Sequence, residues 1–169
     1  MYDMFLYEKY SKLIKPELFL NDGGGHGPAH TKRVLYLALM IAEDYNLSDE
    51  EYEILALACC YHDIGRMHND TDDNHGELSA QKVIEMGLLE QYNSTSKEKE
   101  LILNLIRMHC LDDHLFDAEG RRKLLYQILK DADGLDRVRY GDLNPRYLRL
   151  GKSKRSIPTA SSLLLKIRA

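Results

Sequence analysis

The stretch SDEEYEILALACCYHD, residues 48–63, gives the clearest structural signal in the chain. Ser48 followed by Glu51 is the pattern of a capping box, in which each side chain accepts a hydrogen bond from the backbone N–H of the other residue. Residues 54–61 are all apolar, and the stretch ends on a His-Asp pair. The pattern predicts a buried helix that begins just after Ser48 and places this pair at its C-terminal end.

Helical signals recur over most of the remaining chain. Apolar side chains return at intervals of three or four residues, and a second capping box, a proline suited to a first helical turn and a terminating glycine mark helix ends. Besides 48–63, we expect helices over residues 4–14, 28–42, 76–86, 97–109 and 121–135, with a further short one at 160–167. The Gly-rich residues 21–27 indicate a flexible connection. The sequence therefore predicts an all-α, compact single-domain bundle of about six helices.

Length and composition exclude several classes of protein. A chain of 169 residues is long enough for one domain with a sizeable core, and 44% apolar with 30% charged residues is typical of a globular protein. The longest apolar run, Val34 to Ala42, is too short to cross a bilayer. The first residues lack the features of a signal peptide, and the three cysteines include no C-x-x-C pair. We therefore expect a cytoplasmic protein that does not contact membranes.

Charge divides the chain into two parts. Residues 137–169 contain nine Lys or Arg and one acidic residue, whereas the rest of the chain is strongly acidic. We expect residues 1–140 to form the helical domain that carries the chemistry, and residues 141–169 to be a basic extension packed on it or trailing from it. A basic extension is either a solvated surface or a wall that faces phosphate groups. Nucleic acid is disfavoured as a partner, because the sequence has no RNP motif and no interleaving of aromatic and basic residues.

Four residues on three of the predicted helices are candidate metal ligands. His62 and Asp63 end the apolar helix, His30 is in phase with the apolar face of residues 28–42, and Asp133 follows apolar core positions by one helical turn. A buried carboxylate beside an imidazole is costly unless it is paired or bound to a metal. Imidazole nitrogen and carboxylate oxygen together suit Zn, Fe, Mn, Ni or Co better than Mg. Residue types alone fit a metal site and an internal His–Asp hydrogen-bond network equally well.

Three segments, in order, resemble the signatures of the HD-domain metal-dependent phosphohydrolase superfamily. They are HTKRVLYLA (30–38), ACCYHDIGRMH (58–68) and LKDADGLDRVR (129–139). They match the superfamily's pattern of a His, a His-Asp doublet and a later Asp, all on helices, and the resemblance covers about residues 26–140. It implies an HD-like all-α fold and a divalent metal held by His30, His62, Asp63 and Asp133.

The resemblance also allows for a second metal ion in the same site. Some superfamily members hold a second metal through additional histidines between the doublet and the last Asp. In this chain His75 opens a predicted helix in that interval and His109 ends another. With Asp63 bridging, the expected cofactor is one ion or two of Fe, Mn, Zn, Co or Ni, rather than Mg. The alternative is that both are ordinary histidines at helix ends.

Basic side chains near these ligands are candidates for binding the substrate. Arg66 follows the doublet by one helical turn, and its planar guanidinium suits a phosphate oxygen, although a surface salt bridge is the alternative. His26 and Arg137 are candidate substrate-binding residues. His68 also flanks the expected pocket, and Arg139 is expected to face water.

The expected function is hydrolysis of a phosphomonoester or phosphodiester by a metal-activated water, with Asp63 and Arg66 as catalytic residues. A small phosphorylated substrate, a nucleotide, is implied by the resemblance alone. The chain departs from two subfamilies: no acidic residue follows the doublet closely, as it does in ppGpp hydrolases and 5′-nucleotidases, and the GYP signature of cyclic-di-GMP phosphodiesterases is absent. The alternative function is a non-catalytic HD-fold module that senses a nucleotide or a metal.

Overall fold

The helix predicted to begin after Ser48 is α3, Asp49–Tyr61, and both hydrogen bonds of its capping box form. The Ser48 hydroxyl accepts from the backbone N–H of Glu51 at 3.2 Å, and the Glu51 carboxylate accepts from the backbone N–H of Ser48 at 2.8 Å. A second capping box starts α5, Ser96–Met108. Two orphan N–H groups are thus satisfied at each helix start, which fixes where these helices begin.

The computed structural model describes residues 4–20 and 24–168, and over these residues the chain forms eight α-helices, short 3₁₀ turns and no strand. Besides α3 and α5, the helices are α1 (Met4–Ser11), α2 (Pro28–Ala42), α4 (His75–Glu85), α6 (Gly120–Leu135), α7 (Gly151–Arg155) and α8 (Ile157–Lys166). The predicted all-α fold is confirmed. Residues 21–23 of the predicted flexible connection lie outside the described residues.

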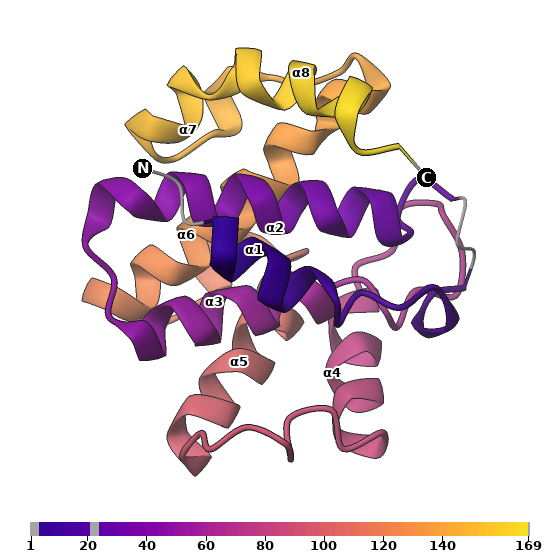
Figure 1. Ribbon diagram of the computed structural model, residues 1–169, viewed down its shortest axis with the longest axis vertical. Coiled ribbons are helices and arrows are strands. Elements are labelled where there is room, and N and C mark those ends of the chain that lie inside the picture. The colour runs from indigo at the N-terminus through magenta and orange to yellow at the C-terminus, as the bar shows by residue number, and fades with distance from the viewer. Residues whose placement is uncertain (1–3, 21–23, 169) are drawn as a thin grey trace.

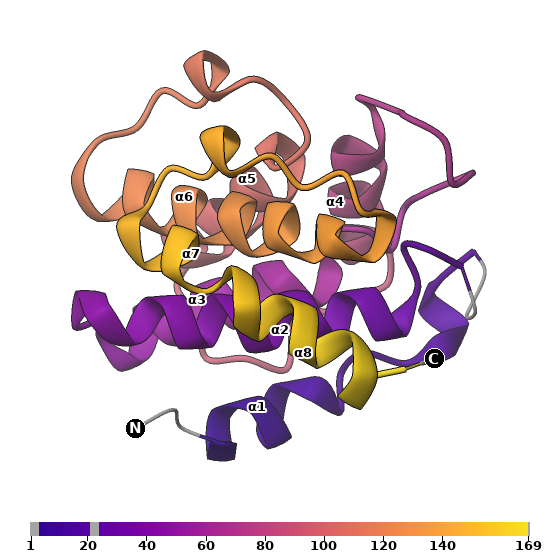
Figure 2. The same ribbon diagram turned by 90° about the horizontal axis from the view of Figure 1, so that it is seen from above.

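Helix α2 is the centre of the bundle. It packs against α3 and α6, while α4 and α5 pair with each other and α5 also packs on α3 (Figure 1). The positions that define its predicted apolar face, among them Val34, Leu37 and Ile41, are fully buried. Both α1 and α8 pack against α2, and in the view from above both lie toward the same side of it (Figure 2). Helices far apart in the sequence therefore meet around α2.

Two glycines permit close approaches that bring helix ends together. A Cβ atom on Gly65 would lie 2.1 Å from the backbone N of Ser79 in α4, and a Cβ on Gly76 would lie 2.4 Å from the carbonyl O of Arg107 in α5. Real Cβ atoms do not approach so closely, so any larger residue would push these helices apart. The first approach holds the end of α3 against α4, and the second holds the start of α4 against the end of α5.

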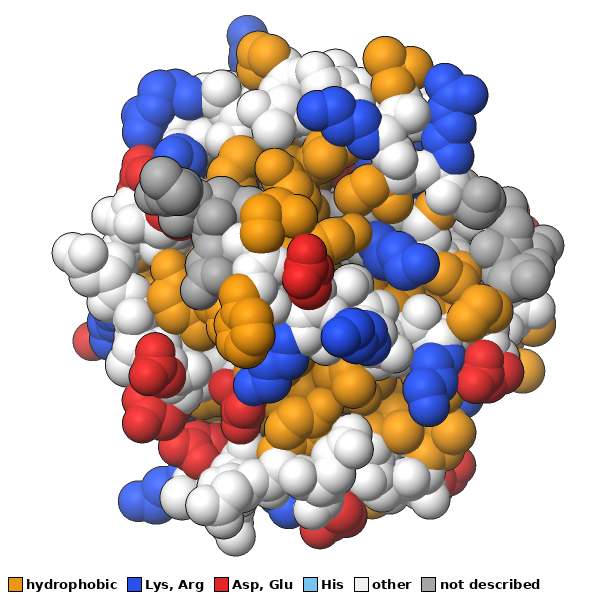
Figure 3. Space-filling view, in the orientation of Figure 1, with side chains coloured by type: hydrophobic (Ala, Val, Ile, Leu, Met, Phe, Trp, Pro, Cys, Tyr) orange, Lys and Arg blue, Asp and Glu red, His pale blue; other side chains and the backbone are white. Residues whose placement is uncertain are grey.

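The C-terminal segment is more structured than the sequence indicates. One short helix is predicted there, whereas residues 151–166 form α7 and α8, and α8 packs on α2 and on the 3₁₀ turn Asp136–Tyr140. At the other end, α1 ends at Ser11 rather than at residue 14, because a turn precedes Pro16. The face in Figure 3 shows mixed charges and scattered apolar groups, and no histidine among the described residues is visible on it.

Candidate metal centre

Six predicted ligand side chains meet at the place where five helices end or begin. The sequence separates them widely, but α2 supplies one histidine, the end of α3 the doublet, the start of α4 and the end of α5 one histidine each, and the end of α6 an aspartate. They are His30, His62, Asp63, His75, His109 and Asp133. All but Asp133 are at most 4% exposed, and the Asp133 side chain is 33% exposed. The cluster is therefore buried, with Asp133 as its most exposed member.

The first group of ligand atoms surrounds the Nε2 atom of His30. That atom lies 3.2 Å from Oδ1 of Asp133, 3.3 Å from Nε2 of His62 and 3.4 Å from Oδ2 of Asp63. The ligand atoms of His30, His62 and Asp133 all lie within 4.8 Å of one another, which fits a shared ion. The predicted ligand set of the first metal is thus brought together in full.

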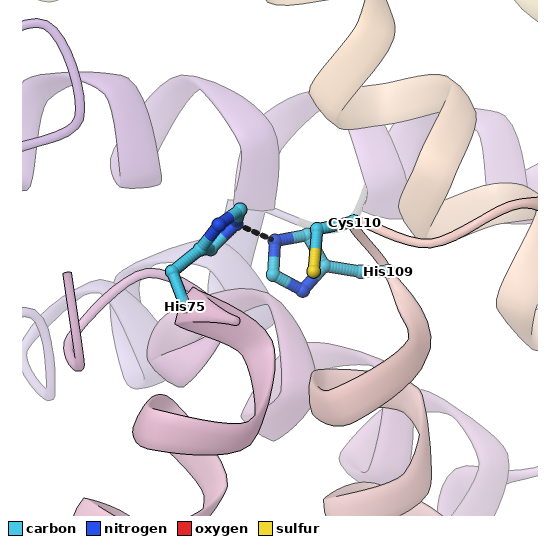
Figure 4. A group of neighbouring side chains, drawn as sticks. All are labelled: His75, His109 and Cys110. Atoms are coloured by element: carbon cyan, nitrogen blue, oxygen red, sulfur yellow. Dashed lines mark hydrogen bonds between the residues drawn. The ribbon is translucent and has the colours of Figure 1, made fainter. Parts of the chain in front are cut away.

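The second group lies on the other side of Asp63. Nε2 of His75 is 3.0 Å from Nε2 of His109, and these atoms lie 3.3 and 3.5 Å from Oδ1 of Asp63. Figure 4 shows the two rings turned toward each other from the start of α4 and the end of α5, with Cys110 beside them. Asp63 therefore presents one carboxylate oxygen to each group, as a bridging carboxylate does.

The outer nitrogen of each ring fixes its orientation. Nδ1 of His62 donates to the carbonyl O of Cys59 at 2.7 Å, and Nδ1 of His109 donates to the carbonyl O of Ile106 at 2.6 Å. Nδ1 of His75 is likewise bonded to a backbone carbonyl in the preceding loop. A carbonyl oxygen only accepts, so Nδ1 must carry the hydrogen in these rings. This is the arrangement that orients histidine toward a metal through Nε2.

The donor set calls for a positive charge at its centre. When Nδ1 carries the hydrogen of a neutral imidazole, Nε2 carries only a lone pair. In the neutral rings of His75 and His109 two lone pairs then face each other at 3.0 Å, beside the anionic carboxylate of Asp63. Such a contact is repulsive unless a positive charge lies beside the atoms, and in the metal-free protein the Arg66 guanidinium, 3.2 Å from Nε2 of His75, supplies part of it. Buried imidazole nitrogens and carboxylate oxygens in this geometry fit a divalent transition metal.

The comparisons with known proteins agree with this geometry. Residues 29–138, more than half of the chain, match the family model of the HD domain. The chain belongs to the HD domain family. No curated protein and no solved structure matches it. No helix in the described part of this HD domain combines the length and the hydropathy that a membrane-spanning segment needs.

His30 differs in charge from His62 and His75 in this HD domain. Burial lowers its pKa, but the surrounding carboxylates, first that of Asp133, outweigh burial and raise the pKa to about 10. Burial lowers the pKa of His62 to about 4, and that of His75 to about 4 as well. In the metal-free protein, His30 therefore carries the proton that partly neutralises the carboxylates.

Metal binding should therefore release a proton from His30. The ring stays protonated below its pKa of about 10 and must be neutral to coordinate, so affinity should rise about tenfold per pH unit between pH 7 and 9. Titration calorimetry of the metal-free protein with Zn²⁺, in two buffers of different ionisation enthalpy, measures the protons released. Affinity that does not change between pH 7 and 9 would contradict this assignment.

Asp136 holds His30 in place, although Asp136 was not among the predicted site residues. This fully buried carboxylate accepts from Nδ1 of His30 at 2.7 Å and from Nε and Nη2 of Arg33 at 2.6 and 3.0 Å. Nη1 of Arg139 donates to it at 3.2 Å. Arg139 was expected to face water; this expectation is wrong, because its side chain is only 10% exposed. The sequence contains one indication that Asp136 belongs to the site: it follows Asp133 by three residues, nearly one helical turn, so both lie on the same helix face.

We expect Asp136→Asn to weaken binding of the first ion by about 10–100-fold, the usual effect of losing an outer partner of a metal-bound histidine. The amide keeps the size but loses the charge that orients the His30 ring and balances Arg33. Titration with a competing chelator measures the affinity, and circular dichroism at the assay temperature checks that the variant is folded. Wild-type affinity in a folded variant would show that Asp136 only supports packing.

The candidate substrate residues lie around the cluster. Arg66 donates through Nε to Oδ1 of Asp63 at 3.0 Å and through Nη2 to Nε2 of His75 at 3.2 Å, so it belongs to the site. His26 donates from Nδ1 to Oδ2 of Asp63 at 3.0 Å. Arg137 is half exposed and paired with an acidic neighbour.

Two cavities adjoin the cluster. The first, of about 280 Å³, is lined by His26, Arg66 and His75 together with the acidic loop that precedes α4. The second, of about 470 Å³, is lined by His109 and Asp133 and by residues that follow Gly141. Arg137 and Cys110 line both. His68 lines neither of these two cavities; its side chain is 51% exposed.

Proposed function

We propose that this HD domain is a metal-dependent phosphohydrolase that cleaves a phosphomonoester or phosphodiester, with a nucleotide as the substrate. One observation carries the proposal. A pair of histidine Nε2 atoms lies beside each carboxylate oxygen of Asp63, His30 and His62 at Oδ2 and His75 and His109 at Oδ1. The proposed first ion is held by His30, His62, Asp63 and Asp133, and the proposed second ion by Asp63, His75 and His109. Fe, Mn, Zn, Co and Ni are the proposed metals, because the donors mix imidazole with carboxylate.

A divalent cation held in this cluster supplies a Lewis acid for phosphoryl oxygens and lowers the pKa of a water that it binds. The chain supplies orientation and charge. His26 donates to Oδ2 of Asp63, and in the metal-free protein Arg66 donates to Oδ1, so the carboxylate is oriented between the two groups before an ion binds. The guanidinium of Arg66 and the exposed Arg137 both reach the first cavity, where they can donate to phosphate oxygens.

His26 is the proposed proton donor to the leaving oxygen. Its Nδ1–H donates to Oδ2 of Asp63, which holds the ring at the edge of the cluster, and in the imidazolium form the ring would carry a second proton on Nε2 for the leaving oxygen. The ring is only 16% exposed, and it lies edge-on to His30. A leaving oxygen that develops negative charge would take the Nε2 proton, and the ring would remain neutral with its Nδ1–H still bonded to Asp63.

A panel of phosphate esters tests the proposed function. Purified protein is freed of metal with a chelator, reloaded separately with Mn, Fe, Co, Ni, Zn or Mg, and assayed against nucleoside monophosphates, cyclic nucleotides and simple phosphate esters. We expect hydrolysis that requires one of the transition metals and is lost again with chelator. Protein that binds metal but hydrolyses none of these esters would favour a sensing module instead, and protein that binds no metal would favour an internal hydrogen-bond network.

A further inference from the structure

We propose that Tyr147 determines which leaving group the enzyme accepts, by stacking on the planar base of a nucleotide whose phosphate lies at the metal cluster; this inference rests on the proposed function. The residues that display Tyr147, 141–150, follow the part of the chain that carries the metal ligands. We name them the pocket loop. The loop is held rigidly beside the cluster, and its aromatic ring is left open to a ligand.

A buried carboxylate anchors the pocket loop. Asp131 in α6 is fully buried, and it accepts from the backbone N–H of Arg149 at 2.9 Å and from that of Leu150 at 2.8 Å. The Arg149 guanidinium returns to the same carboxylate at 3.1 Å and also makes two hydrogen bonds to Asp113 at 2.6 and 2.7 Å. A buried charge that is satisfied by loop N–H groups fixes the loop's position, since releasing the loop would leave the charge unpaired.

The loop is also rigid at its tip. Pro145 starts a 3₁₀ turn that ends at Tyr147, and the side chain of Asn144 caps this turn by accepting from the N–H of Arg146 at 3.0 Å. Leu148, next to the tyrosine, is buried and lies 3.6 Å from the position of a Cβ on Gly134 in α6. The backbone on both sides of Tyr147 is therefore held, whereas Tyr147 itself is 75% exposed.

The cavity under the loop connects this ring to the cluster. The cavity of about 470 Å³ is lined by His109 and Asp133 of the cluster and also by Asn144 and Tyr147 of the pocket loop. Sites for small organic ligands have volumes of about 300–1,000 Å³, so a nucleoside can fit. Asp133, the most exposed of the six predicted ligands, lies on this side. A phosphate at the cluster would thus place the rest of its ester under the pocket loop.

The chemistry of the lining favours an aromatic group. Lys130 and Arg149, which also line this cavity, are committed to Asp113, so they are poor partners for a second charged group. A tyrosine ring on a fixed backbone offers a large flat face at a small cost in conformational entropy. Stacking of a base on such a ring is worth about 1–3 kcal/mol, which is about 5- to 150-fold in affinity.

The experiment compares adenosine 5′-monophosphate with ribose 5-phosphate, which has the same sugar and phosphate but no base. Binding is measured by equilibrium dialysis with protein loaded with a metal of the panel that does not support hydrolysis, and kcat/KM is measured with a metal that does. We expect Tyr147→Ala to weaken binding of the nucleotide about tenfold and to leave ribose 5-phosphate within about twofold. Tyr147→Phe should retain the preference, because stacking needs the ring and not the hydroxyl. Phe5→Ala is the matched control, since Phe5 is 71% exposed and lines neither cavity.

The outcomes separate this inference from the proposed function. If Tyr147→Ala abolishes the preference in binding while neither these two compounds nor any ester of the panel is hydrolysed, the hydrolase proposal fails and the role of Tyr147 is supported. If both are hydrolysed and the ratio between them is the same in wild type and Tyr147→Ala, the inference is overturned while the hydrolase stands. Equal binding of the two compounds by wild-type protein also overturns the inference.

Discussion

Asp63→Asn should lower kcat by about 10⁴-fold, the scale on which losing a central catalytic group acts. Asp63 is the residue that both ligand groups share, with Oδ2 toward His30 and Oδ1 toward His75. An amide has one oxygen and no charge, so it cannot serve two cations. We therefore expect both the activity and the bound metal to be lost. Elemental analysis of the purified variant and steady-state kinetics on the best substrate measure the two effects.

The loss should not come from unfolding. Asn keeps the shape of Asp, and the apolar core of the bundle is unchanged, so the variant should stay folded although the amide no longer balances the charge of Arg66 and of the protonated His30. Circular dichroism and thermal unfolding of metal-free wild type and variant check this. Asp44→Asn is the matched control, because it removes a carboxylate that pairs with Lys152 at 3.0 Å on the surface, far from the ligands in the fold. A folded Asp63→Asn protein with near-wild-type kcat would show that the cluster is not the catalytic site.

The fold was predictable because its signals are local. Capping boxes and apolar repeats act within one helix, so α3 and α5 begin where the sequence places them. The C-terminal segment was less predictable, because its order depends on distant partners. The pocket loop is fixed by Asp131 in α6, and α8 is fixed by packing on α2. Neither contact leaves a periodic trace in the sequence.

The candidate metal ligands were predictable from the residue types of three motifs in a fixed order, but the residues that orient these ligands were not. The His-Asp doublet and its flanking motifs named six side chains that the fold brings together. Asp136, which orients His30, lies 106 residues away from it in the sequence. Gly76, which lets the start of α4 reach the end of α5, looks like any glycine in a helix until the carbonyl of Arg107 is placed beside it. Both contacts join residues of different helices, so they become apparent only once the helices are placed side by side.

Arg66 contacts the atoms that would bind the proposed second ion. Its guanidinium donates to Oδ1 of Asp63 and to Nε2 of His75, which are two of the proposed ligand atoms of the second ion. Arg66 therefore places a positive charge where that ion would sit, and the two compete. When the ion binds, the guanidinium must leave these atoms, and the first cavity, which it lines, is where it would meet a substrate phosphate.

Arg66→Ala should accordingly have two opposite effects. Without the competing charge, the second ion should bind more tightly, so metal content should approach two per chain at a lower metal concentration. Without the donor to phosphate, kcat should fall by about 10²–10³-fold, as it does when one donor to a developing charge is removed. Equilibrium dialysis against Co²⁺ measures the first effect and steady-state kinetics at saturating metal the second.

Arg66→Lys separates charge from geometry. An ammonium group keeps the charge but not the fork of two donors, so it should restore only part of kcat. Because its reach and donor directions differ, it should also compete less well than arginine for Asp63 and His75. If Arg66→Ala changes neither metal content nor kcat, Arg66 is only a partner that neutralises Asp63. If metal binding tightens while kcat is unchanged, the arginine regulates occupancy of the second group and does not touch the substrate.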